Sequence, residues 1–211
     1  MATIAVAVLL VGPSWAQAPN STSAESHSPP PEQWSFSFNL SGYIVPNDRS
    51  YASPTFSADK QRFHFGARYN YEDKETGSFW LGYTFEVGDK LVLQATPMIG
   101  GVLGNTTGIA PGYQASLNWE KLELSTEGEF VFDTKESVGS FFYSWMELSY
   151  SPLEWCRAGL VAQRTKAYHT NLDIQRGLLI GFSHKQMDFT TYIFNAGWTD
   201  PTVVLSLGLR F

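Results

Sequence analysis

The sequence predicts an all-β protein, a single antiparallel transmembrane β-barrel of twelve strands, with ten strands as the alternative. Apolar and polar residues alternate through most of the chain from residue 34 onward, which is typical of strands with one apolar and one polar face. The alternating segments have the length, about 9–11 residues, that a tilted strand needs to cross a bilayer. Tight and longer breaks alternate between them, as short turns and longer loops do at the two ends of such a barrel; only the last external turn, Thr199-Asp200, is shorter than this pattern predicts.

Twelve alternating segments follow one another to the end of the chain. They cover residues 35–45, 51–59, 61–72, 78–87, 90–103, 109–120, 122–133, 141–150, 153–165, 174–184, 188–198 and 201–211. The tightest breaks lie at Lys60, Gly88-Asp89, Lys121, Ser151-Pro152 and Lys185 to Met187, always after an even-numbered segment. If the first strand runs outward, these breaks are periplasmic turns and the others are external loops. We expect none of the external loops to be long enough to fold back into the barrel as a constriction.

The segment at residues 51–59 is the weakest of the twelve because it contains Pro54. Proline is tolerated in strands mainly at edges and bulges, so we expect a local distortion there. Without this segment the count would be odd, and the two ends of the barrel would not lie on the same side of the membrane.

The last eleven residues alternate up to a terminal aromatic residue. Val203, Leu205, Leu207, Leu209 and Phe211 share one parity and form an apolar face. This ending resembles the last strand of Gram-negative outer-membrane β-barrel proteins, the porin-like class, in which every-other-residue hydrophobes precede a terminal Phe or Trp. The resemblance implies a place in the cell outer membrane, in contact with its lipid and lipopolysaccharide. It also implies that this strand is the assembly signal read by the barrel-assembly machinery.

The start of the chain reads as an export signal. Residues 1–18 have an apolar core from Ile4 to Val11 and an A-x-A cleavage site at Ala16-Gln17-Ala18, as secretory signal peptides do. No Lys or Arg precedes Arg49, so the usual positive n-region is missing. Residues 19–33 are rich in Ser and Pro, and we expect a disordered periplasmic leader. The barrel would then occupy residues 34–211.

The composition fits a barrel. Aromatic residues make up 15% of the chain, as lipid-facing girdles require. Apolar residues make up 43% and mean hydropathy is −0.16, which is not the composition of a helical membrane protein. The formal net charge of −6 argues against a nucleic-acid partner.

Charged residues at alternate positions of apolar strands are expected to face the lumen, because a charge facing lipid at mid-membrane costs on the order of 2–4 kcal/mol. The predicted lumen-lining set is Arg62, His64, Arg68, Glu72, Glu86, Glu123, Glu127, Glu129, Glu147 and Arg157. Residues of the opposite parity, such as Tyr69 and Tyr71, are expected to face lipid. Glu127, Glu147 and Arg157 lie at middle depth, so we predict that Arg157 pairs with Glu147 or Glu127.

Three functions remain open. The first is a porin-like channel for passive diffusion of small hydrophilic solutes, with an acidic excess that favours cations or polar neutral molecules. The second is a structural or rim-binding barrel whose lumenal charges satisfy one another and close the lumen; twelve strands are intermediate between a plug and a pore. The third is an outer-membrane lipid-modifying enzyme.

The enzyme is the least favoured of the three. Such enzymes need a nucleophile or an activated water with its base, and none of the four histidines has an evident serine and acid partner at a recognisable spacing. The best candidate dyad is His64 with Glu86. The sequence contains no metal-ligand cluster and no phosphate-binding glycine-rich loop, so we expect no cofactor and no metal.

Two Gln-Arg pairs flank one hairpin at the predicted extracellular rim, Gln163-Arg164 and Gln175-Arg176. A symmetric hairpin would pair Arg164 with Gln175, yet alternation places these two on opposite faces. The register or a bulge must therefore break the symmetry. An outward arginine could donate charge-assisted hydrogen bonds to lipopolysaccharide phosphates; alternatively, each arginine caps a strand end in solvent.

Overall fold

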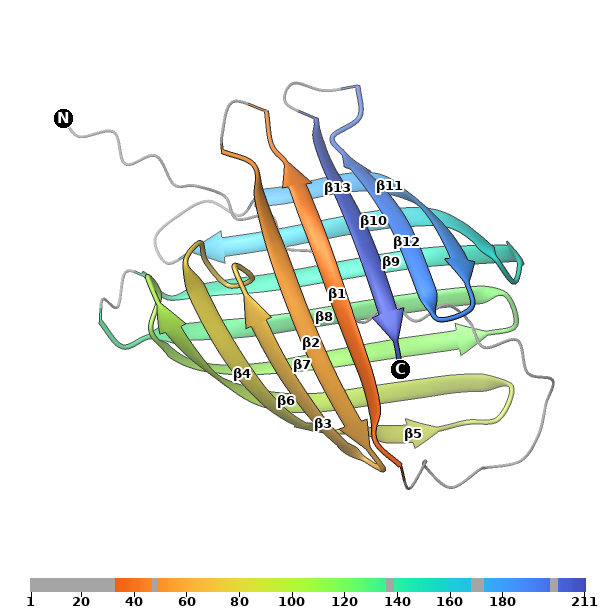
Figure 1. Cartoon of the computed structure of the whole chain (residues 1–211), viewed down its shortest axis with the longest axis horizontal. Helices are drawn as coiled ribbons and strands as arrows, with labels where there is room; N and C mark the ends of the chain where they lie inside the picture. The colour runs from red at the N-terminus through yellow and green to blue at the C-terminus, as the bar shows by residue number, and fades with distance from the viewer. Residues whose placement is uncertain (1–32, 47–48, 136–138, 168–172, 198–200) are drawn as a thin grey trace.

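A computed structural model describes residues 33–46, 49–135, 139–167, 173–197 and 201–211 (Figure 1). The signal peptide and nearly all of the leader predicted above lie outside these residues. The described strands are β1 Ser35–Ile44, β2 Tyr51–Lys60, β3 Phe63–Tyr69, β4 Thr76–Tyr83, β5 Phe85–Val87, β6 Leu91–Gly104, β7 Gly108–Trp119, β8 Leu122–Asp133, β9 Phe141–Leu153, β10 Cys156–Ala167, β11 Asp173–His184, β12 Met187–Phe194 and β13 Thr202–Arg210. No helix in this part of the chain is long and apolar enough to span a membrane.

The strands form one closed antiparallel sheet. Apart from β4 and β5, strands that follow one another in sequence are paired, β13 pairs with β1, and β4 pairs with β6. The thirteen strands make twelve spans, because β4 and β5 are two pieces of one span interrupted at Thr84, and both pieces pair with β6. The predicted twelve-strand barrel is therefore confirmed, and the ten-strand alternative is wrong.

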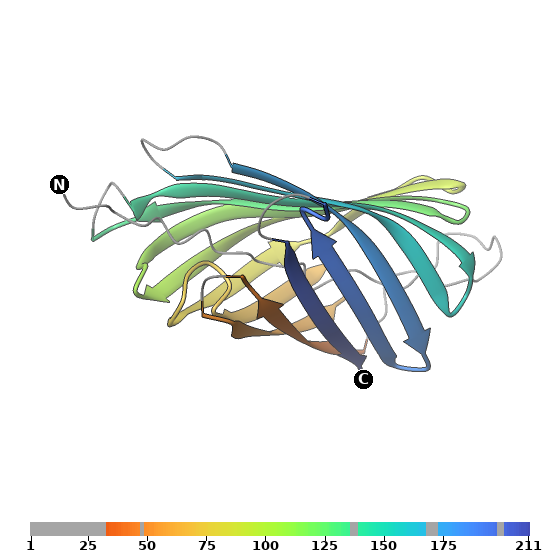
Figure 2. The same cartoon turned by 90° about the horizontal axis from the view of Figure 1, so that it is seen from above.

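The barrel is flattened. Figures 1 and 2 show one wall formed by β1, β2, β3 and β13 lying over a second wall formed by β7, β8 and β9, with the strands of the two walls crossing. This shape brings inward side chains from non-neighbouring strands into contact.

The two ends of the barrel differ in their connections. Both termini of the barrel lie at one end, where the Phe36 N–H donates to the Phe211 carbonyl at 2.9 Å; we name it the terminal end. Its five turns are two or three residues long: 61–62, 88–90, 120–121, 154–155 and 185–186. The opposite end, the loop end, holds connections of three to seven residues. The predicted alternation of short and long breaks is confirmed, although β9 runs through Ser151-Pro152 to Leu153.

The expected distortion at Pro54 is wrong. Pro54 pairs with Leu40 in an unbroken β1–β2 register. The β2–β3 ladder begins only at Thr55, opposite Arg68. Pro54, which has no N–H to donate, is therefore tolerated just before this ladder starts. The register shift lies instead between Cys156 and Ala158 of β10.

The outer face is apolar and ringed with aromatic side chains at the terminal end. Phe36 stacks with both Phe56 and Phe211 at centroid distances of 6.1 and 5.9 Å. Trp155 stacks with Phe182 in the same way, on the far side of β13. Such a girdle is typical of barrel strands that meet a membrane interface.

Candidate functional site in the barrel interior

The charged side chains named by the sequence gather mostly inside the barrel. The following are buried on its inner side: His64, Arg68, Glu72, Glu123, Glu127, Glu129, Glu147 and Arg157. Glu86 is exposed at the terminal end and accepts a hydrogen bond from Gln94 at 3.0 Å. Arg62 does not line the lumen: it lies exposed in the β2–β3 turn, because the chain reverses at Gln61 (φ 54°) before β3 begins.

Arg68 of β3 spans the interior to reach β8. Its Nη1 lies 3.1 Å from Glu129 Oε2, and its Nη2 lies 3.9 Å from Glu127 Oε2. A third carboxylate, Glu72, has Oε1 3.9 Å from Nη1. Since β4, β6 and β7 separate β3 from β8 in the sheet, this cluster ties two walls together across the lumen.

Aromatic rings hold the Arg68 guanidinium in place. The Tyr71 ring centroid lies 4.2 Å from the guanidinium carbon, and the Trp80 centroid lies 4.7 Å from it, both as cation–π contacts. The Trp80 ring lies close over two glycines of the wall: an added Cβ would stand 2.7 Å from the ring at Gly100 and 3.0 Å at Gly112. The lack of a side chain at Gly100 of β6 and at Gly112 of β7 therefore makes room for the indole.

Arg157 of β10 forms a second cluster. Its Nη1 lies 3.2 Å from Glu147 Oε2, so the predicted pairing with Glu147 is confirmed. Its Nη2 donates to Thr190 Oγ1 at 2.7 Å and lies 3.5 Å from Asp188 Oδ1. Both of these partners stand on β12, one strand beyond β11. The side chain reaches them by crossing Gly181, where a Cβ would lie 2.7 Å from Arg157 Nε.

The connection between β3 and β4 turns two side chains into the barrel. Asn70 (φ 53°) and Glu75 (φ 56°) bracket this loop, and the Asn70 side chain accepts the Glu75 N–H at 2.7 Å. Tyr71 and Glu72 between them are each 1% exposed, and the Tyr71 hydroxyl donates to Glu127. Two expectations are therefore wrong: Tyr71 does not face lipid, because the left-handed residue Asn70 ends the alternation of β3, and a short loop does constrict the lumen.

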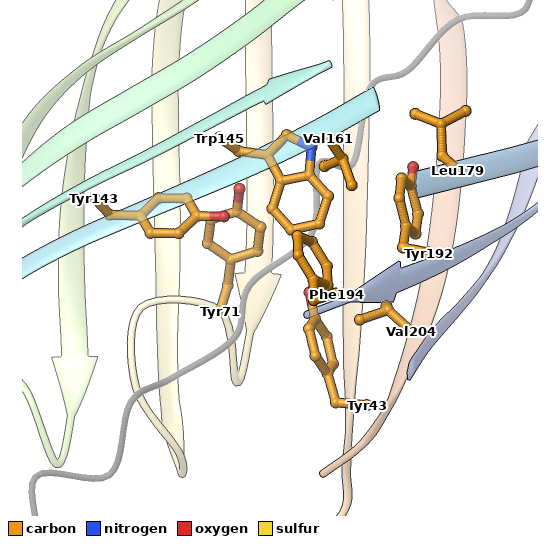
Figure 3. Close-up of a cluster of buried hydrophobic side chains, with 9 residues drawn as sticks. All are labelled: Tyr43, Tyr71, Tyr143, Trp145, Val161, Leu179, Tyr192, Phe194 and Val204. Atoms are coloured by element: carbon orange, nitrogen blue, oxygen red, sulfur yellow. The ribbon is translucent and has the colours of Figure 1, made fainter. Parts of the chain in front are cut away.

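An aromatic cluster fills the loop-end half of the interior (Figure 3). Tyr71 lies edge-on to Tyr143, and Trp145 packs edge-on against Tyr192 and Phe194 at centroid distances of 5.3 and 5.2 Å. Its members are Tyr43, Tyr71, Tyr143, Trp145, Val161, Leu179, Tyr192, Phe194 and Val204. Each is at most 4% exposed, so these side chains pack against one another and narrow this level of the lumen.

The terminal half of the interior is open by comparison. A cavity of about 560 Å³ lies there, lined mostly by hydroxyl and amide side chains. Among them are Ser37, Ser57, Gln94, Thr96 and Gln114, together with Arg210 of the last strand. From the terminal end to the loop end, the interior thus consists of the polar cavity, the two arginine–carboxylate clusters and the aromatic cluster.

His64 does not form the candidate dyad with Glu86. Its Nδ1 lies 2.7 Å from Asp59 Oδ1, because Asp59 is its direct cross-strand neighbour on β2. Within the described residues His64 makes no hydrogen bond to a serine, threonine or cysteine. No group of three or more His, Cys, Asp or Glu side chains in the described chain is arranged to hold a metal ion.

The β10–β11 register resolves the two Gln-Arg pairs. Gln163 pairs with Gln175 on the inner face, whereas Arg164 is opposite Ile174 and Arg176 is opposite Ala162 on the outer face. Both arginines are exposed. The register of this hairpin is therefore shifted by one residue from the symmetric pairing, in which Arg164 would be opposite Gln175.

The residues of the predicted assembly signal lie on the outer face of β13. Leu205 and Leu207 are 38% and 37% exposed, and Phe211 is 64% exposed. Val203 and Leu209 are half-buried beside them. β13 closes the barrel through its pairing with β1.

Sequence reasoning missed several interior residues that complete the two clusters. Trp80, Asp188 and Thr190 have the inward parity, but an uncharged or strand-end residue carries no signal of its own in an alternating pattern. Gly181 gives no local signal either, since its role depends on a side chain from the neighbouring strand.

No protein-family model matches the chain, and no curated protein does. Among solved structures, the chain is similar to the KdgM porin, at 12% identity and a TM-score of 0.65 over 83% of this chain and 99% of that one. The KdgM porin in complex with disordered oligogalacturonate matches at 10% identity and a TM-score of 0.63, over 83% and 99% of the two chains. A structure from work on in-meso crystallization of membrane proteins matches at 11% identity and a TM-score of 0.56, over 84% and 83%. The chain has the β-barrel fold of the KdgM porin.

Proposed function

We propose that the protein is a porin-like channel of the cell outer membrane, for passive diffusion of small hydrophilic solutes. The observation that carries the proposal is a closed twelve-span barrel with an apolar outer face and charged side chains inside it. In a closed barrel the backbone N–H and C=O groups are hydrogen-bonded between neighbouring strands. An apolar outer face can therefore contact lipid without leaving backbone polar groups unsatisfied. The likeness in fold to the KdgM porin supports a channel over an enzyme.

The interior favours small cations and polar neutral solutes over polyanions. Six carboxylates are buried with two arginines, namely Glu72, Glu123, Glu127, Glu129, Glu147 and Asp188 with Arg68 and Arg157. Rings of acidic side chains favour cations in a narrow pore. Oligogalacturonate, the ligand in the KdgM complex, is a polyanion, so we do not expect it to be a solute of this acidic interior.

The second candidate is a barrel with an occluded lumen that serves the envelope as a structural or rim-binding element. The observation that favours it is the contact of Arg68 with Glu129 and of Tyr71 with Glu127 across the lumen. These contacts and the aromatic cluster leave the inward side chains at mid-barrel inaccessible to water.

Conductance of the refolded protein in planar bilayers separates the two candidates. We expect the wild type to give small, discrete conductance steps, and Tyr71→Ala to raise them several-fold, because it removes a ring of the aromatic cluster and its contact with Glu127 across the lumen. Tyr69→Ala is the matched control, since Tyr69 is 47% exposed on the outer face, and should leave conductance unchanged. If neither the wild type nor Tyr71→Ala conducts, the occluded barrel is the correct function.

Two further parts of the proposal concern partners. Val203, Leu205, Leu207, Leu209 and Phe211 would serve as the signal for the barrel-assembly machinery, since they form an uninterrupted apolar face on the closing strand. Lipid would cover the outer face of the barrel. Deleting Phe211 should lower the amount of heat-stable barrel in the outer membrane while leaving export to the periplasm intact.

A further inference from the structure

The loop-end half of the outer face is almost free of charge. Among the strand side chains that the structure describes there, Arg164 of β10 and Arg176 of β11 are the only charged ones that point away from the lumen. No acidic side chain stands on the described outer faces of β9 to β12. Neither guanidinium has an ion pair or hydrogen bond within the described residues.

The register holds the two arginines side by side. Arg164 is opposite Ile174, so Arg176, two residues further along β11, is its diagonal neighbour, a relation in which the backbones lie about 7–8 Å apart and long side chains can meet. The pair stands at the level where β12 ends: Asn195, the first residue after that strand, donates its N–H to the Arg176 carbonyl at 2.8 Å.

The surface next to the arginines, toward the terminal end, is apolar. Leu160 and Leu178 are direct cross-strand partners and are 57% and 55% exposed. A guanidinium that faces lipid at mid-membrane costs on the order of 2–4 kcal/mol, and about 0–1 kcal/mol near an interface. Two guanidinium groups that have no ion pair among the described residues, above an apolar surface, therefore match an amphiphile with an anionic headgroup above its acyl chains.

We propose that Arg164 and Arg176 form a docking site for the phosphate-bearing headgroup of a membrane lipid in the leaflet at the loop end. Guanidinium groups bind phosphate oxygens by charge-assisted, often bidentate hydrogen bonds. The acyl chains of the lipid would lie along Leu160 and Leu178. The proposal rests on the membrane location proposed above and is independent of conduction through the lumen.

The test measures lipid binding to the refolded full-length chain in neutral detergent micelles. The probes are dioleoyl phosphatidic acid, dioleoylglycerol as the neutral analogue with the same acyl chains, and inorganic phosphate. Native mass spectrometry gives the number of bound lipids and their apparent affinities. The variant Arg164→Gln/Arg176→Gln is compared with Arg62→Gln/Lys90→Gln, which removes the same two charges from exposed turns at the terminal end.

We expect the wild type and the control variant to bind phosphatidic acid at least tenfold more tightly than dioleoylglycerol, and the Arg164/Arg176 variant to lose this preference. Each single variant should lose part of it, which covers the case in which the double variant does not fold. The proposal is overturned if the Arg164/Arg176 variants keep the preference, or if the control variant loses it equally. It is also overturned if inorganic phosphate displaces the lipid at low millimolar concentration, which would identify a site for free anions.

Discussion

Arg68 and Glu129 stand on strands that are not neighbours in the barrel, yet their side chains meet at 3.1 Å. Glu129 is 4% exposed and Arg68 is 6% exposed. This contact bridges the lumen because the flattened cross-section brings β3 and β8 together.

A double-mutant cycle should detect the bridge. We expect Arg68→Gln and Glu129→Gln to couple by about 0.5–3 kcal/mol in the free energy of unfolding, because each removes the other's nearest charge partner. The free energy is measured by urea titration in lipid vesicles. The control cycle combines Arg68→Gln with Glu123→Gln, which shares no ion pair with it, and should be additive. Additivity of the Arg68/Glu129 cycle would show that the two charges do not meet in the folded barrel.

Removal of the Arg157 guanidinium should destabilise the barrel. Arg157→Gln leaves Glu147, which is 1% exposed, as a buried carboxylate without its partner. The expected loss is about 3–5 kcal/mol in the free energy of unfolding. Arg62→Gln is the matched control: Arg62 is exposed in a turn, and we expect a change within about 0.5 kcal/mol. Equal effects of the two substitutions would argue against the ion pair.

A methyl group at Gly181 should displace Arg157. The added Cβ would stand 2.7 Å from Arg157 Nε and 3.0 Å from Thr190 Oγ1, so the arginine would lose its path to β12. We expect Gly181→Ala to cost about 1–3 kcal/mol of stability. Gly101→Ala is the control, because nothing lies within 4 Å of a Cβ built there. The interpretation fails if the two variants unfold at the same urea concentration.

Neutralising the mid-barrel carboxylates should reduce cation preference. In Glu127→Gln/Glu129→Gln/Glu147→Gln, Arg68 and Arg157 keep Glu72 and Asp188 as partners, and the acidic excess of the lumen falls. We expect the reversal potential under a salt gradient to shift toward that of an unselective or anion-preferring channel. Glu86→Gln/Glu120→Gln/Glu154→Gln removes three exposed carboxylates at the terminal end and should cause a smaller shift. An unchanged reversal potential in the first variant would place the selectivity elsewhere.

The alternation of the sequence was sufficient for the strands, their number and their two faces, because neighbouring residues of a strand point to opposite sides whatever the strand contacts. Alternation held at Glu127, Glu147 and Arg157, where parity alone placed the charges inside. It failed at Tyr71, since one left-handed residue at Asn70 ends the strand and resets the side-chain direction. It also failed at Arg62, where the chain turns.

Pairing was decided by the tertiary structure. The register of β10 on β11 made Arg164 and Arg176 diagonal neighbours on the outer face, a relation that neither strand determines by itself. The reach of Arg157 to Thr190 depends on a glycine of the strand between them, and the contact of Arg68 with Glu129 depends on how the closed sheet flattens. Within a regular strand, the sequence by itself determined which side chains face the interior, because that direction is a local property of the strand; it did not do so at Tyr71 and Arg62, where the strand has ended. Which of them meet across the lumen, and hence how far it is closed, was determined only by the tertiary structure, because those contacts join strands that are not neighbours in the sheet.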